Sequence, residues 1–138
     1  EPVDGMMRIK KDPYRRGRRA VHAVTYHFVW CSKRQASVLK GAVENRLEEM
    51  LHEVAEEHDW GIDSPAIPPH HVHLFVQADT RHAPDQVIHR FKGTSAHVLR
   101  DEFDHLHRLP SLWTRSYFVS TTGKRNESVV EQYIEDQS

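Results

Sequence analysis

The chain has 138 residues, of which 38% are hydrophobic and 28% charged, and its formal net charge is −1 at pH 7. This length and composition are those of one globular domain that can bury a core without disulfides or a structural metal. The single cysteine, Cys31, excludes a disulfide framework and a cysteine-rich zinc site, and with no signal-peptide or bilayer-spanning pattern it predicts a cytoplasmic protein.

The start of the chain is polar and basic. Residues 1–19 have no apolar periodicity, which predicts a basic arm ahead of one domain over residues 20–138. Ten basic residues and one acidic residue lie within residues 8–40, whereas residues 44–63 contain eight acidic residues and one basic residue. The basic segment can contact phosphate although the net charge is near zero, and a solvated surface is the alternative interpretation.

The first half of the domain has the pattern of a strand, a helix and a strand. Residues 20–30 are rich in β-branched and aromatic residues, which predicts a strand. A basic connector over residues 32–39 leads to residues 41–59, where apolar residues recur at helical spacing and predict an amphipathic helix. Residues 60–67 predict a short strand that ends at Pro68.

The second half has the pattern of a strand, a helix, a strand and a helix. Residues 71–78 are short, apolar and aromatic, which predicts a central strand. Residues 84–103 predict a second amphipathic helix, which residues 109–111 are expected to break. Residues 116–121 predict a further strand, and residues 127–137 predict a last helix.

This order of elements is that of the split β-α-β, or ferredoxin-like, fold of the α+β class. It predicts a four-stranded antiparallel sheet with two helices on one face. The other face is left for a site, a partner or the terminal helix.

The predicted central strand contains His71-Val72-His73. Side chains at i and i+2 of a strand lie on the same face, so two imidazoles project together from backbone positions about 7 Å apart. They can converge on one metal ion. Two inert surface histidines are the alternative interpretation, and Phe75 shares their face.

Tyr133 and Gln137 are four residues apart on the last predicted helix and therefore share a face. A tyrosine hydroxyl can act as a nucleophile, and a glutamine carbonyl oxygen can bind a metal without adding charge. Packing and solvation are the alternative roles for this pair.

Basic residues provide candidate contacts to nucleic acid, because their charges neutralise phosphate groups. The candidates are Arg15, Arg16, Arg18, Arg19, Lys33, Arg34, Arg90 and Lys92. Gly93 lies within a predicted helix, where glycine costs about 1 kcal/mol relative to alanine. It indicates either a close approach by another backbone or ligand, or simple helix packing.

Four stretches occur in an order that matches a known family: YHFVWCSKR, PPHHVHLFV, FKGTSAHVLR, and LWTRSYFVSTTG leading to YIEDQ. Over residues 20–137 the chain resembles the single-tyrosine HUH transposases, or TnpA-like proteins, which move the smallest insertion sequences as single-stranded DNA. One departure is His70, which occupies a position where the family usually has aspartate.

The resemblance implies roles for individual residues. Tyr133 matches the nucleophile, which forms a 5′-phosphotyrosine link and frees a 3′-hydroxyl group. His71, His73 and Gln137 match the ligands of a divalent metal ion, Mg²⁺ or Mn²⁺, and no nucleotide cofactor is implied. The implied partners are DNA hairpins at the element ends and a second copy of the chain, whose site the Tyr133 helix can complete in trans.

Three other functions remain open at this stage. A domesticated relative that processes repeated palindromes would keep the same chemistry. A non-catalytic nucleic-acid-binding module would use the sheet to stack bases and would not need the tyrosine and the histidines together. A nuclease with metal-activated water would survive loss of the Tyr133 hydroxyl group.

Overall fold

The computed structural model describes residues 24–121 and 127–137, so the predicted basic arm lies outside the described residues. The elements follow the predicted order, with two short helices added. They are β2 (Val24–Cys31), η1 (Lys33–Gln35), α1 (Ala42–Glu57), β3 (Gly61–Ile62), β4 (His71–Ala78), α2 (Pro84–Glu102), α3 (Asp104–His107), β5 (Phe118–Ser120) and α4 (Glu127–Asp136). None of these helices is long and apolar enough to cross a membrane.

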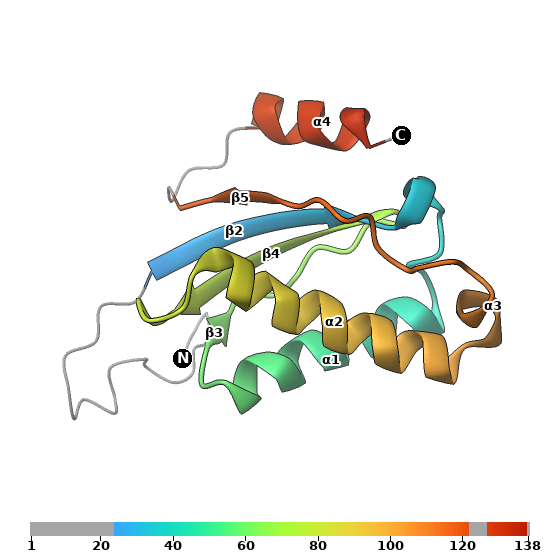
Figure 1. Cartoon of the computed structure of the whole chain (residues 1–138), viewed down its shortest axis with the longest axis horizontal. Coiled ribbons are helices and arrows are strands. Elements are labelled where there is room, and N and C mark those ends of the chain that lie inside the picture. Colours follow the sequence, from blue (N-terminus) through green and yellow to red (C-terminus); the bar gives the residue numbers. More distant parts are fainter. Residues whose placement is uncertain (1–23, 122–126, 138) are drawn as a thin grey trace.

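The four described strands form one sheet in the order β3-β4-β2-β5, and every neighbouring pair is antiparallel. Helices α1 and α2 lie against one face of this sheet, and α4 lies on the opposite side (Figure 1). The predicted ferredoxin-like fold is therefore confirmed. The face beneath α4 is called the α4 face below.

The core lies between the sheet and the two long helices. Alternate residues of β2 and β4 point into it, and the apolar stripes of α1 and α2 cover them. The largest fully buried side chains include Phe28 and Trp30 of β2, Leu47 and Leu51 of α1, Leu74 of β4, and Ile88 and Phe91 of α2. Because β2 and β4 bury one face here, their other residues are directed to the α4 face.

Two predicted strands are shorter than expected. The strand expected over residues 116–121 is reduced to β5. The strand expected over residues 60–67 is reduced to β3 and an isolated bridge between Ala66 and His73, because Pro65 has no amide hydrogen to donate. The second long helix ends at Glu102, within one residue of its predicted end, but the break comes before residues 109–111. There Phe103 takes an extended conformation (φ −121°, ψ 109°) and packs against the core, and α3 follows.

Candidate functional site

Strand β4 places His71 and His73 on the α4 face, since Val72 between them is fully buried in the core. The Nε2 atoms of the two imidazoles lie 3.1 Å apart. Two nitrogens bound to one ion at about 2.0–2.1 Å would be separated by about 2.9–3.4 Å for right-angled to tetrahedral coordination. The predicted convergence of the two rings is thus present, and the spacing fits a shared divalent ion.

The environment of His71 favours the neutral imidazole that a metal requires. Burial, with a smaller contribution from the neighbouring His70, lowers the pKa of His71 to about 4. The ring is therefore uncharged at neutral pH, and an entering cation does not have to compete with a positive charge on it at that pH. His70 touches His71 directly, with the two Nδ1 atoms 3.1 Å apart.

Helix α4 carries Tyr133 but ends at Asp136, so Gln137 lies one residue past the helix that was expected to include it. Both side chains contact Ser116, which lies just ahead of β5. The Ser116 hydroxyl lies 3.0 Å from the phenol oxygen of Tyr133 and donates to Oε1 of Gln137 at 2.8 Å. Burial raises the pKa of the Tyr133 phenol, and the hydrogen bond between Tyr133 and Ser116 partly offsets that rise. The predicted pair does share a face, and in this arrangement the phenol is held protonated.

Two contacts fix α4 on the sheet. The side-chain amide of Gln35 donates to the backbone carbonyl of Ile134, and Val130 is almost fully buried at 3% exposure. The ring of Tyr133 lies 6.2 Å from that of Phe118 in β5. Helix α4 therefore holds the tyrosine over the same face as the two histidines.

Cys31 connects the two halves of the site. It pairs with His71 in the β2–β4 register, and its proximity adds to the rise in the pKa of Tyr133. Burial also raises the pKa of the Cys31 thiol. A buried, protonated thiol is a poor nucleophile, which argues against Cys31 as the nucleophile of this site.

The donor set for a metal consists of two imidazoles and one amide. Within residues 24–121 and 127–137, no three His, Cys, Asp or Glu side chains gather in a way that could hold an ion. The third predicted ligand, Gln137, is engaged elsewhere: its amide contacts Ser116 and the backbone of Tyr133, and neither imidazole is among its partners in the described chain. For Gln137 to coordinate a metal through Oε1, the hydrogen bond that the Ser116 hydroxyl donates to this atom would have to break.

The predicted DNA-contacting residues fall into three groups. Four arginines of the arm lie outside the described residues, whereas Arg34 and Arg90 are exposed and Lys33 is partly exposed. Lys92 is instead half-buried, and its Nζ donates to the carbonyl oxygens of Thr114 at 2.8 Å and Ser116 at 3.1 Å. A phosphate contact by Lys92 would compete with these hydrogen bonds.

Gly93 follows Lys92 on α2 but is not there for helix packing. A Cβ atom at this position would meet no atom within 4 Å, so the described part of the fold leaves its surface open. The expectation that helix packing explains this glycine is wrong. An approach from outside the described residues stays a prediction.

Three residues near the site are not among the predicted site residues. Ser116 and Gln35 resemble ordinary surface residues, and only the tertiary structure brings them to α4. His27 carries a usable signal, because strand alternation places it opposite Phe28 and therefore on the face of the two histidines. In the structure, the Nε2 atom of His27 lies 3.4 Å from Nδ1 of His73.

Known proteins resemble this chain along most of its length. A family model described as IS200-like transposase matches residues 20–137. The ISDra2 transposase TnpA of Deinococcus radiodurans is 29% identical over 126 residues, which cover 89% of this chain and 90% of that protein.

Solved structures show the same similarity. The crystal structure of a candidate transposase from Deinococcus radiodurans R1 has a TM-score of 0.79 and 31% identity, and covers 88% of this chain and 95% of that one. A REP-associated tyrosine transposase bound to a REP hairpin has a TM-score of 0.54 and 14% identity, with 83% and 66% coverage, and so shares the fold.

Proposed function

This chain belongs to the IS200-like transposase family and is a DNA transposase, and from that premise we propose that it cleaves and rejoins single-stranded DNA with Tyr133 as its nucleophile. The phenol oxygen attacks the phosphorus of a phosphodiester and loses its proton. The bond from phosphorus to the 3′ oxygen breaks, and that oxygen leaves as a hydroxyl group. The products are a 5′-phosphotyrosine link and a free 3′ end, which can later attack the link and restore a phosphodiester.

The observation that carries this proposal is the pair of imidazole nitrogens 3.1 Å apart on the face over which α4 holds Tyr133. Two neutral imidazoles and one neutral amide would leave a bound cation its full charge. We therefore assign His71, His73 and Gln137 as the ligands of Mg²⁺ or Mn²⁺. When bound, the ion would stabilise the negative charge that develops on the scissile phosphate.

In the arrangement described above, the Tyr133 phenol is protonated, so it must be activated before it can attack. Burial raises the pKa of Tyr133, so attack at neutral pH requires positive charge near the phenol to favour loss of its proton. Ser116 holds both the phenol and the Gln137 carbonyl oxygen. A rearrangement at Ser116 that frees Gln137 would therefore change the ligand set and the nucleophile together.

We propose that the DNA partner is a hairpin at each end of an insertion sequence. A fold relative is described as bound to a REP hairpin, and Arg34 and Arg90 are exposed here for phosphate contact. We also propose a homodimer in which α4 can complete the partner's site. The chain spans 90% of the ISDra2 transposase TnpA, which favours an insertion-sequence enzyme over a domesticated relative.

The test is an incubation of the protein with single-stranded hairpin DNA from the flanks of its own gene, with Mg²⁺ or Mn²⁺. A denaturing gel should show a covalent protein–DNA adduct that EDTA prevents and that Tyr133→Phe lacks. Cleavage without an adduct, retained in Tyr133→Phe, would instead indicate a nuclease that uses metal-activated water. DNA binding with neither cleavage nor adduct would indicate a non-catalytic module.

A further inference from the structure

Each histidine of the metal pair contacts another imidazole through the nitrogen that faces away from the pair. Nδ1 of His73 lies 3.4 Å from Nε2 of His27, and Nδ1 of His71 lies 3.1 Å from Nδ1 of His70. We propose that His27 and His70 are positioning residues that direct the Nε2 atoms of His73 and His71 at the metal. This inference rests on the metal site of the proposed function.

Burial and ring packing hold the imidazole of His27 in a fixed position. It is 1% exposed and stacks on the ring of Phe75 with centroids 4.3 Å apart and an interplanar angle of 10°. Phe118 approaches it edge-on, with centroids 6.1 Å apart. A buried imidazole needs hydrogen-bond partners, and the nitrogen that faces His73 satisfies part of that need.

Counting protons shows what these outer rings must do. The two Nε2 atoms are at hydrogen-bond distance, and a hydrogen bond between them needs a proton on one of the two. A bound metal requires both Nε2 atoms to be bare. The proton of each neutral ligand ring then sits on Nδ1. His27 and His70 must therefore accept a hydrogen bond from the Nδ1–H groups of His73 and His71.

The two outer contacts differ in chemistry from the usual arrangement. A ligand histidine most often donates its second nitrogen to a carboxylate, a carbonyl oxygen or water, and a carboxylate raises the basicity of the ligand. Here the acceptor behind His71 is the imidazole ring of His70, which carries no negative charge. Replacing His70 by aspartate should therefore strengthen metal binding, whereas replacing it by alanine should weaken it.

Mn²⁺ binding measured by titration calorimetry in the absence of DNA separates these roles. His27→Phe keeps a ring to stack on Phe75 but loses the acceptor, and it should weaken Mn²⁺ binding by about 10- to 100-fold. His27→Gln returns an acceptor and should restore most of the affinity. His58→Phe is the matched control, because His58 also stacks on an aromatic ring, that of Trp60, with centroids 4.5 Å apart.

The double variant His71→Ala with His73→Ala distinguishes the two levels of the proposal. If it abolishes binding while His27→Phe, with an unchanged melting temperature, binds as wild type, the positioning role is wrong and the metal site stands. If the double variant still binds Mn²⁺ normally, the metal site itself is wrong and the positioning role falls with it. Loss of affinity in His27→Phe with recovery in His27→Gln supports both.

A measurement on the unaltered protein covers the case in which His27→Phe does not fold. Two-bond ¹H–¹⁵N spectra of the imidazoles with Zn²⁺ added report which nitrogen of each ring carries the proton. We expect His71 and His73 to be protonated on Nδ1 and bound through Nε2. Binding of either ring through Nδ1 would overturn the proposal. His27 or His70 would then face a nitrogen that has no hydrogen to donate.

Discussion

The hydroxyl group of Ser116 lies 3.0 Å from the phenol oxygen of Tyr133, and so joins the residue ahead of β5 to the helix that carries the nucleophile. The same hydroxyl donates to Gln137. One small side chain therefore contacts two of the four residues to which we assign the chemistry. Removal of this hydroxyl group should change the pKa of the phenol more than the stability of the fold.

Ser116→Ala should raise the pKa of Tyr133 further. The Ser116 hydroxyl can turn to donate to the phenolate when Tyr133 ionises, which lowers the pKa, so its loss leaves the effect of burial less opposed. The ¹³Cζ shift of tyrosine, followed against pH and assigned with Tyr133→Phe, measures this change. Ser116→Thr keeps a hydroxyl and serves as the control; a lower pKa in Ser116→Ala would contradict the role of this contact.

Lys92 should make the stability of the protein depend on alkaline pH. Burial lowers the pKa of Lys92 to about 8 from 10.5, so the unfolded chain binds more protons between these values and the free energy of unfolding rises with pH there. Partial exposure and the carbonyl contacts limit the gain to about 1–2 kcal/mol.

Denaturant unfolding of wild type and Lys92→Met from pH 7.5 to 10 tests this dependence. The difference between the two proteins should change with pH in the stated direction. Exposed Lys40→Met should follow wild type throughout. A constant difference between wild type and Lys92→Met would show that Lys92 keeps its ordinary pKa.

Val130 should hold α4 on the sheet, whereas its neighbour should not. Val130 is 3% exposed and Val129 is 45% exposed. Val130→Ala removes two buried methyl groups and should weaken the docking of α4 by about 1.5 kcal/mol. Hydrogen exchange of the α4 amides should accelerate in Val130→Ala but not in Val129→Ala, and equal acceleration in both would argue against docking through Val130.

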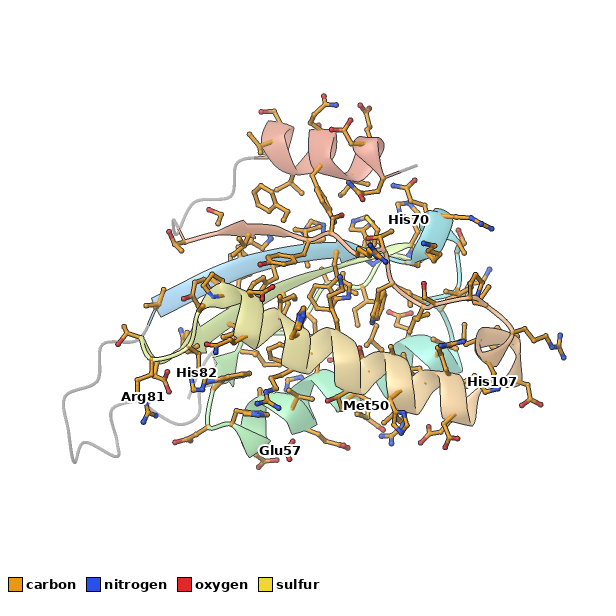
Figure 2. The ribbon with its side chains drawn as sticks, viewed as in Figure 1. Met50, Glu57, His70, Arg81, His82 and His107 are labelled. Atoms are coloured by element: carbon orange, nitrogen blue, oxygen red, sulfur yellow. The ribbon has the colours of Figure 1, made fainter. Side chains whose placement is uncertain are left out.

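Arg34 and Arg90 should contribute charge to DNA binding. Neutralising a residue that contacts a phosphate lowers the slope of log affinity against log salt by about one. Hairpin binding by Arg34→Gln and Arg90→Gln, measured at several salt concentrations, tests each contact. Arg81→Gln is the control, because Arg81 already pairs with Asp79 at 3.0 Å and lies with His82 at the end of the molecule opposite His70 (Figure 2).

The fold follows from the sequence where local patterns decide it. Strand β4 is predicted over the residues that it occupies, since prolines precede it and Asp79 follows its apolar run. The convergence of His71 and His73 follows from strand alternation alone. These features depend on neighbours in sequence, which is why they can be predicted.

The remaining contacts of the site depend on segments far apart in sequence. Gln35 meets the carbonyl of Ile134 across 99 positions, and no local pattern marks either residue. Val129 and Val130 are equally apolar, and only the orientation of α4 decides which one is buried. The carbonyl contacts of Lys92 likewise require the folded segment after α3. The sequence therefore shows that Lys92 is charged but not that its ammonium group is held by backbone carbonyls.

Strand β4 also limits which genetic changes the protein can accept. Its residues alternate between a fully buried apolar side and the histidine side, as Val72 and His73 illustrate. A substitution alters one side chain, but a single-codon deletion inside the strand shifts every later residue to the opposite side. We therefore expect a deletion scan to find β4 intolerant of any change in length, even at positions where many substitutions are harmless.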